Sequence, residues 1–107
     1  MMARRVVGSG FQEFVADQLS GLRGATFRSM FGGYGIYQGT TFFGIVFKGR
    51  LYFKTSERTR RRYVSAGMGP FRPSAKQTLK NYYEVPAEVI EDADKLLAWA
   101  EQAAARS

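Results

Sequence analysis

The chain has 107 residues, of which 45% are hydrophobic and 15% aromatic, and its formal net charge is +7. This length allows one domain with a single two-layer core, and the apolar content excludes a disordered chain. The sequence contains neither Cys nor His, which excludes disulfide scaffolds, catalytic triads and most zinc sites.

No segment of the chain predicts export or insertion into a membrane. Residues 1–10 contain two arginines but only a two-residue apolar stretch, which is too short for the hydrophobic region of a signal peptide. No run approaches the roughly 18 apolar residues that a membrane span requires. The lack of Cys agrees with a reducing compartment. We therefore expect a cytoplasmic protein that does not enter the membrane, with residues 1–9 flexible.

Apolar side chains at helical spacing predict a first helix over residues 11–22. Ser9 and Gln12 have the form of a capping box at its start. Glycines follow the last apolar position and are expected to end the helix. Residues 26–30 then predict a first strand.

Three aromatic and β-branched runs follow, over residues 30–37, 41–47 and 50–55. The short segments between them, residues 38–40 and 48–49, have the Gly-containing composition of hairpin turns. The sequence therefore predicts a meander of antiparallel strands.

The glycine-rich residues 32–35 could be interpreted as a phosphate-binding loop, since Gly lets backbone amides approach an anion. However, no Gly-Lys-Ser or Gly-Lys-Thr sequence follows, and the next predicted element is a strand instead of a helix. We interpret the segment as a turn or bulge that needs unusual backbone angles.

Both faces of the predicted strand 41–47 are apolar, as in an interior strand. Simple alternation places Phe42, Gly44 and Val46 together in a row on one face. The predicted helices suffice to cover only the other face, and a large exposed apolar patch is rare in monomers. We expect this row to form a homodimer interface, or else to be covered by residues 68–80 folding back over it.

A short helix is predicted over residues 57–66, with Thr55 or Ser56 as its N-terminal cap. The segment 68–77 contains glycine and two prolines, and it predicts an irregular loop.

The remaining residues predict a strand over 79–85, a helical turn up to residue 90 and a final helix over 92–104. The acidic residues around Asp92 and Asp94 could suggest a Mg²⁺ or Ca²⁺ site. A role at the positive end of the final helix is the better interpretation, because no calcium-loop pattern accompanies them.

Three aromatic residues near the C-terminus are interpreted as packing residues. Tyr82 and Tyr83 alternate across a strand, so one should lie in the core and the other should be half exposed. Trp99 is expected to anchor the final helix by packing.

Charge is distributed unevenly along the sequence. Residues 1–83 contain 14 basic and 3 acidic side chains, whereas residues 84–107 contain 2 basic and 6 acidic ones. Ten of the basic residues lie between residues 48 and 80, interleaved with aromatic residues. This pattern fits either a nucleic-acid surface or, in the simpler interpretation that we favour, a solvated basic face whose aromatic residues point inward. The candidate nucleic-acid-binding residues are Arg58, Arg60, Arg61, Arg62 and Lys76.

The segment Met30–Tyr37, with the sequence Met-Phe-Gly-Gly-Tyr-Gly-Ile-Tyr, resembles the N-terminal domain of the TfoX/Sxy family. The segments Tyr82–Val89 and Leu96–Ala100 add to this resemblance, which extends from about Phe11 to Ala104. The family consists of bacterial proteins linked to the regulation of natural competence. The resemblance implies a two-layer domain of the secretion-chaperone-like kind and a regulatory role alongside the transcription machinery.

We therefore expect an α+β fold with one antiparallel sheet of about four to six strands. Helices 11–22 and 92–104 should cover one face, with helix 57–66 at an edge. For function, we expect a non-enzymatic regulatory or protein-interaction module without catalytic residues, cofactor or metal. Its partner would be an unidentified protein, such as a component of the transcription machinery. The alternative is a sequence-nonspecific nucleic-acid-binding protein.

Overall fold

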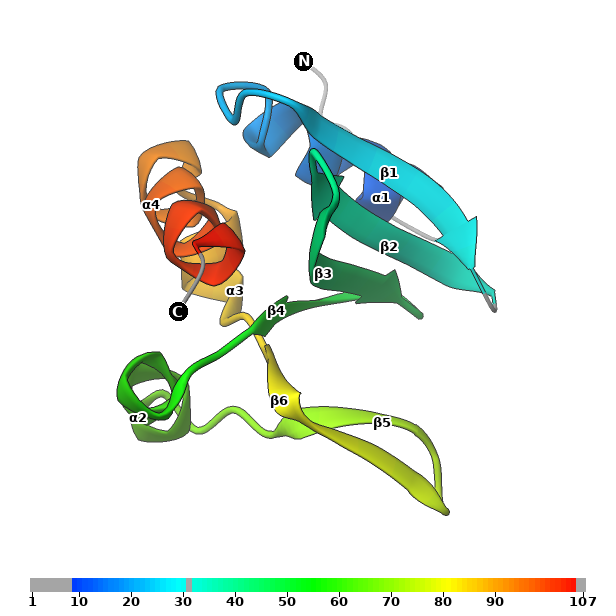
Figure 1. The fold of residues 1–107 in the computed structure, drawn as a ribbon, viewed down its shortest axis with the longest axis vertical. Coiled ribbons are helices and arrows are strands. Elements are labelled where there is room, and N and C mark those ends of the chain that lie inside the picture. Colours follow the sequence, from blue (N-terminus) through cyan, green and yellow to red (C-terminus); the bar gives the residue numbers. More distant parts are fainter. Residues whose placement is uncertain (1–8, 31, 106–107) are drawn as a thin grey trace.

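The computed structural model describes residues 9–30 and 32–105, and Figure 1 shows its arrangement of helices and strands. Residues 1–9 are predicted to be flexible; of these, residues 1–8 lie outside the described residues, and Ser9 begins α1. The elements in chain order are α1 (Ser9–Gln18), β1 (Ala25–Met30), β2 (Gly33–Gln38), β3 (Thr41–Phe47), β4 (Arg50–Lys54), α2 (Glu57–Ser65), β5 (Pro70–Ser74), β6 (Gln77–Glu84), α3 (Ala87–Ile90) and α4 (Ala93–Ala104).

The six strands form one twisted sheet in the order β1-β2-β3-β4-β6-β5, and every neighbouring pair is antiparallel. The chain leaves β4 through α2 and returns at the outer edge of the sheet as β5, so that β6 pairs with β4 (Figure 1). The predicted α+β fold and strand number are confirmed.

The turn between β3 and β4 follows the predicted hairpin chemistry. Lys48 and Gly49 form this two-residue connection, and both have positive φ angles, of 51° and 75°. Two left-handed residues in succession give the turn a twist that matches that of the flanking strands. The hairpin prediction at residues 48–49 is therefore confirmed.

The helices bury one face of the sheet. Val15 of α1 and Leu96 of α4 are fully buried against Ile36 of β2 and Phe53 of β4. The helix α1 is shorter than predicted, since it ends at Gln18, but the turns that follow it keep the next apolar residues in the core. Ser9 is predicted to cap this helix, but its side chain is not among those that the structure describes.

On the opposite face, the hairpin of β5 and β6, and not a helix, buries part of the sheet. Phe71 of β5 is 1% exposed and packs against Ile45 of β3 and Tyr52 of β4. The prediction of an irregular loop over residues 68–77 is thus wrong. The prolines of β5 are tolerated because β5 is an edge strand. A proline lacks the backbone N–H, but at the edge of a sheet this costs no hydrogen bond between strands.

The predicted row of Phe42, Gly44 and Val46 does not exist. Ile36 pairs with Gly44 while the next residue, Tyr37, pairs with Phe42, so one extra residue of β3 bulges out between them. A bulge shifts the alternation of the strand by one position. Val46 therefore joins the core under the helices, whereas Phe42 packs on the opposite face.

Gly44 lies on the helix-covered face as well, where a Cβ would approach the side chains of Ile36 and Phe53 to 3.1 and 3.3 Å. The prediction of which residues of the strand 41–47 share a face is therefore wrong. The apolar row that this prediction gave as a dimer interface is wrong as well. Packing of Phe71 shows that part of the segment 68–80 folds over the sheet, on the face that carries Phe42.

Candidate functional site

The helix α2 begins with the chemistry expected from the sequence. The backbone N–H of Thr59 donates to Ser56 Oγ over 3.2 Å, and the backbone N–H of Ser56 donates to Thr59 Oγ1 over 2.9 Å. These reciprocal bonds form a capping box and identify Ser56 as the N-cap. Gly67, with a φ of 82°, follows the helix. The four arginines of α2 therefore project from a short helix with a well-defined start and end.

Arg60 fastens α2 to the sheet. Its Nε donates to Thr55 Oγ1 over 3.0 Å, and its Nη2 donates to Asn81 Oδ1 of β6 over 3.2 Å. The guanidinium also lies 5.9 Å from the ring centroid of Tyr83. The side chain of Arg60 is half-buried by these contacts, so its role is at least in part structural.

Arg62 fastens the same helix to α4. Its Nη2 donates to Gln102 Oε1 over 2.9 Å, and its guanidinium lies 4.8 Å from the ring centroid of Trp99. Trp99 in turn packs edge-on against the buried Tyr63 of α2, with ring centroids 4.8 Å apart. The predicted packing role of Trp99 is confirmed.

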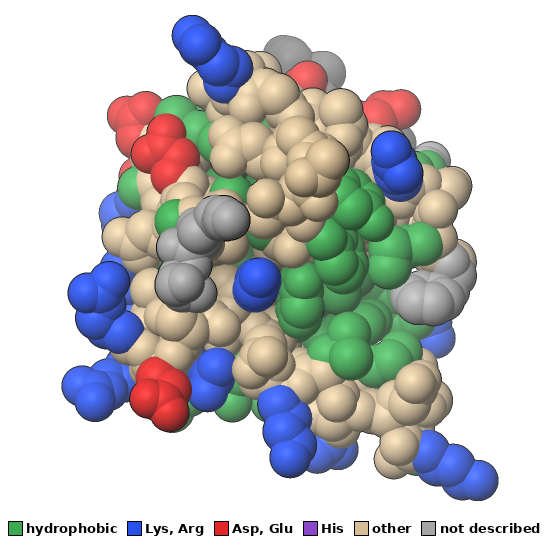
Figure 2. Space-filling view, viewed as in Figure 1, with side chains coloured by type: hydrophobic (Ala, Val, Ile, Leu, Met, Phe, Trp, Pro, Cys, Tyr) green, Lys and Arg blue, Asp and Glu red, His purple; other side chains and the backbone are tan. Residues whose placement is uncertain are grey.

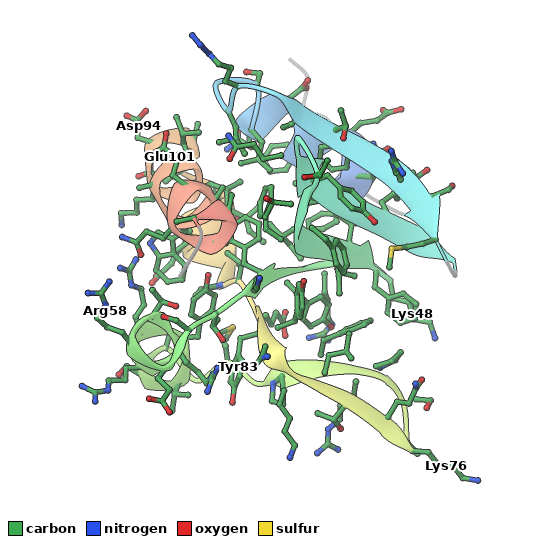
Figure 3. All side chains as sticks on the ribbon, in the orientation of Figure 1. Lys48, Arg58, Lys76, Tyr83, Asp94 and Glu101 are labelled. Atoms are coloured by element: carbon green, nitrogen blue, oxygen red, sulfur yellow. The ribbon has the colours of Figure 1, made fainter. Side chains whose placement is uncertain are left out.

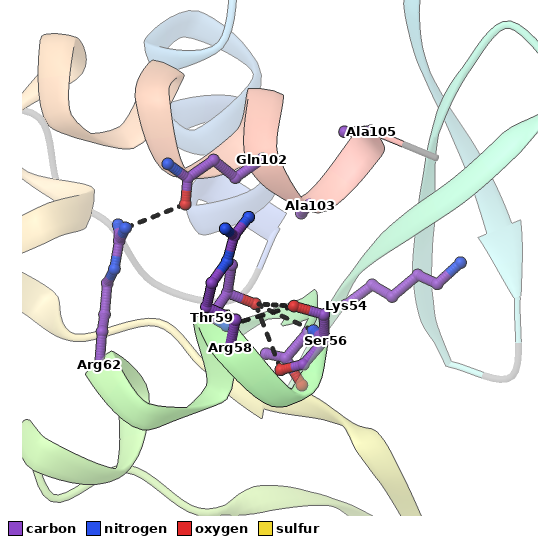
Figure 4. Close-up of a pocket in the computed structure, with 9 residues that line it drawn as sticks. Lys54, Ser56, Arg58, Thr59, Arg62, Gln102, Ala103 and Ala105 are labelled. Carbon is purple, nitrogen blue, oxygen red and sulfur yellow. Dashed lines mark hydrogen bonds between the residues drawn. The ribbon is translucent and has the colours of Figure 1, made fainter. Parts of the chain in front are cut away.

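Arg58 and Arg61 differ from these two arginines. Both are exposed, and among the described residues neither side chain has a hydrogen-bond partner. Arg58 lines a pocket of about 430 Å³ between the start of α2 and the end of α4, shown in Figure 4. The other lining residues are Lys54, Thr55, Ser56, Thr59, Arg62, Gln102, Ala103 and Ala105. This lining contains three cations and no acid.

Lys76 lies apart from the arginines. It is at the tip of the β5–β6 hairpin, whereas Arg58 is on the opposite side of the molecule, as Figure 3 shows. The structure therefore brings Arg58 and Arg61 onto one exposed helix surface, ties Arg60 and Arg62 to neighbouring elements, and does not bring Lys76 to the same place.

Sequence reasoning missed a second surface, which we call the aromatic face: Tyr37, Phe42, Phe47 and Tyr82. All four side chains are half-buried. The ring centroids of Tyr37 and Phe42 are 5.1 Å apart, and those of Phe42 and Tyr82 are 5.3 Å apart. Figure 2 shows a patch of hydrophobic side chains in this region, between the β1–β2 and β5–β6 hairpins.

The rings of the aromatic face are held by the sheet beneath them. Tyr82 Oη donates a hydrogen bond of 3.2 Å to the carbonyl oxygen of Phe42 across the intervening β4. Burial, with a smaller contribution from the neighbouring Tyr37, raises the pKa of Tyr82 to about 12. Tyr82 is thus a neutral hydrogen-bond donor at physiological pH, and the aromatic face carries no negative charge of its own.

Both tyrosines of β6 are half-buried, on opposite faces: Tyr82 packs with the aromatic cluster and Tyr83 with the helix-covered core. The predicted alternation is confirmed, since Tyr83 packs against the main core and Tyr82 is half exposed on the other face.

Acidic residues are concentrated outside the sheet, whereas basic residues occur both on the sheet and on α2. The strands and their turns, residues 25–54 and 67–84, carry one acidic residue, Glu84, which accepts two hydrogen bonds from Arg50 Nη1, of 3.0 and 3.2 Å. The other eight acids belong to α1, α2, α3, α4 and the α3–α4 connection. The cations of the sheet region are Arg28, Lys48, Arg50, Lys54, Arg72, Lys76 and Lys80.

In Figure 3, Asp94 and Glu101 lie on α4, on the far side of the view from Lys48 and Lys76, whereas Arg58 of α2 lies on the same side as these two acids. Asp92 accepts a hydrogen bond of 3.1 Å from the backbone N–H of Lys95, and it is the N-cap of α4. The predicted helix-capping role of Asp92 is confirmed. Within residues 9–30 and 32–105, no three acidic residues come together in a way that could hold a metal ion, and no helix has the length and apolar character to cross a membrane.

Comparison with known families gives one match. The sequence model of the TfoX N-terminal domain matches residues 17–107. The match covers the whole sheet, α2, α4 and both surfaces described above. No curated protein matches the chain.

Proposed function

Because the chain belongs to the TfoX N-terminal domain family, we propose that it is a competence-regulator-like interaction module of the bacterial cytoplasm. In this proposal it catalyses no reaction and acts by binding a protein partner, such as a component of the transcription machinery. The family match over residues 17–107 is the observation that carries the proposal.

The pocket between α2 and α4 supports a protein partner that presents carboxylates. Lys54, Arg58 and Arg62 line it without an opposing acid. Arg62 is already held by Gln102, which leaves Lys54 and Arg58 to pair with incoming groups. Charge-assisted pairs of this kind confer specificity and a fast association rate.

A genetic experiment tests the regulatory role. Deletion of the gene from its native bacterium is expected to lower the frequency of transformation by added DNA and the transcript levels of DNA-uptake genes. The wild-type gene should restore both quantities, whereas the Arg58→Glu/Arg61→Glu double variant should not, because it reverses the charge of the exposed α2 surface. The matched control is Arg23→Glu/Lys95→Glu, which makes the same charge change at two exposed residues outside this surface. Unchanged transformation and transcripts in the deletion strain would refute a competence role.

A second candidate function is sequence-nonspecific binding of nucleic acid. It is supported by the separation of charge, since seven cations and one neutralised acid lie in the sheet region. A surface of one sign attracts a polyanion and raises its local concentration.

A further inference from the structure

We propose that the aromatic face binds single-stranded nucleic acid, with bases stacked on Tyr37 and Phe47 in the places that Arg28 and Lys48 now occupy, and with phosphates held by these two cations. The inference rests on the second candidate function and supplies its site and substrate class. The candidate binding residues chosen from the sequence lie mainly on α2, whereas the surface proposed here lies on the sheet face opposite the main core.

The rings offer the aromatic surface that unpaired bases require. Tyr37 and Phe42 come from β2 and β3, and their ring planes are inclined by only 31°; Phe42 and Tyr82 are inclined by 33°. At these distances near-parallel rings overlap face to face, so the three rings form a stacked row across the sheet with Phe42 in its middle. They remain half exposed, although Phe71 beside them is fully buried. Every base has a π-face, so a row of this kind accepts any sequence.

A glycine holds one of these rings in place. A Cβ on Gly35 would come within 2.7 Å of Met30 Sδ and 3.1 Å of the Phe42 ring. The absence of a side chain at Gly35 lets Met30 and Phe42 close over β2. The rings are thus positioned before any ligand arrives, which lowers the entropy cost of binding.

Two cations lie over the faces of the rings. The guanidinium of Arg28 is 5.1 Å from the ring centroid of Tyr37, and Lys48 Nζ is 5.4 Å from that of Phe47. A base that replaces the cation over either ring would therefore have its phosphate next to the displaced positive charge. This pairing of a stacking ring with a cation is the combination that single-strand-binding surfaces use.

The charge distribution disfavours a second copy of the chain as the occupant. A symmetric pairing through the aromatic face would bring Arg28 and Lys48 of one copy toward those of the other, and Glu84, the acid of the sheet region, is already paired with Arg50. Contact with the acidic residues of α1, α3 and α4 of a neighbouring copy would be head-to-tail, and such contacts form rings or open filaments instead of a symmetric dimer. An acidic peptide would satisfy the charges but would leave the π-faces of the rings unused.

Fluorescence anisotropy with the full chain tests the proposal. The probes are fluorescein-labelled single-stranded DNA and RNA of about 12 nucleotides and duplex DNA of the same length. We expect tighter binding of the single strands than of the duplex, and the tighter of the two single-stranded probes identifies the natural sugar. Tyr37→Leu keeps the apolar volume but removes the π-face, and it should weaken single-strand binding about tenfold.

Two matched double variants locate the site. Arg28→Gln/Lys48→Gln and Arg58→Gln/Arg61→Gln each remove two positive charges. The first should lower the slope of log affinity against log salt by about 1.4, because each phosphate contact on a single strand contributes about 0.7. The α2 variant should behave like Arg23→Gln/Lys95→Gln, which removes two exposed cations elsewhere.

The fold of each variant is checked by circular dichroism and thermal unfolding. Nuclear magnetic resonance of the wild-type chain gives a measurement that needs no variant. Addition of the oligonucleotide should shift the amide signals of β1, β2, β3 and the β5–β6 hairpin and leave those of α2 in place.

Each contrary result has its own meaning. Absence of binding to single strands at low salt would overturn this inference together with the second candidate function. Duplex binding of equal strength that depends on Arg58 and Arg61 would overturn only the site proposed here. Displacement of the oligonucleotide by a polyglutamate peptide of equal charge, at equal concentration, would show that an acidic protein segment is the occupant. The transformation experiment tests the regulatory function independently of all three.

Discussion

Gly33 and Gly35 show how single residues position β2. A Cβ on Gly33 would collide with the carbonyl oxygen of Val46 and lie 3.2 Å from the Phe47 ring. Close approach of strands and rings, and not a positive φ angle, is therefore the reason for Gly at these two positions. The interpretation of residues 32–35 as a turn holds for Gly32, whose φ is 79°.

Tyr82 makes the stability of the protein sensitive to alkaline pH. Its pKa is raised to about 12 in the folded state from a usual value of 10.0, mainly by burial. Below about pH 10 the residue is protonated in both states, so its pKa has no effect on folding. As the pH rises toward 12, the unfolded chain loses the proton first, and the free energy of unfolding falls.

Urea unfolding at several pH values between about 8 and 11.5 measures this fall. Tyr82→Phe should make it shallower, and at neutral pH should cost about 1 kcal/mol because the bond to the Phe42 carbonyl is lost. Tyr63→Phe should act in the same direction above pH 10, since burial also raises the pKa of Tyr63. Equal slopes in wild type and in both variants would contradict the assignment.

At the scale of elements, α2 is held by its arginines as well as by its apolar side chains. Tyr63 is its one buried residue, and a nine-residue helix is too short to be stable alone. Arg60 and Arg62 supply the remaining attachment to β6 and α4. The four arginines of α2 therefore have two different roles: Arg60 and Arg62 attach the helix, whereas Arg58 and Arg61 are exposed. Helical spacing alone distinguishes the exposed pair only approximately.

Arg62→Ala is expected to destabilise the protein by about 1–2 kcal/mol, because it removes a hydrogen bond and the cation–π contact with Trp99. Arg61→Ala, on the exposed side of the same helix, should change stability by less than about 0.5 kcal/mol. Chemical unfolding followed by fluorescence measures both, since Trp99 is the only tryptophan of the chain. Similar losses in the two variants would mean that Arg62 does not attach α2 to α4.

The hairpin of β5 and β6 and the bulge in β3 are the elements that the sequence interpretation did not anticipate. Two prolines made residues 70–74 look irregular, although an edge strand accommodates them. The bulge leaves no local signal, because either face of β3 is apolar and a shift of one residue is compatible with the composition. Both features decide what lies on the aromatic face.

For the whole molecule, the structure removes the exposed apolar row from which the sequence predicts self-association. Val46 is 5% exposed beneath the helices, and Gly44 faces the same core. Homodimer formation stays a prediction, but it can no longer be attributed to an uncovered row of Phe42, Gly44 and Val46.

Val46→Lys is accordingly expected to unfold the chain, because a buried unpaired ammonium costs several kcal/mol in a domain of ordinary stability. Val64→Lys is the matched control, since Val64 of α2 is 55% exposed and should accept the same change with little effect. Circular dichroism and sedimentation velocity at micromolar concentration distinguish the outcomes. A folded, monomeric Val46→Lys variant of a dimeric wild type would restore the interface interpretation.

The sequence by itself determined the features whose causes lie within a few residues. These include the cap at Ser56, the turn at Lys48 and Gly49, the amphipathic helices and the excess of positive charge before residue 84. The tertiary structure alone decided which surfaces result. The contact between Phe42 and Tyr82 joins residues 40 positions apart and depends on strand order, on the bulge and on the return of β5 at the sheet edge. Such contacts follow from the register of the whole sheet, which no short stretch of sequence specifies.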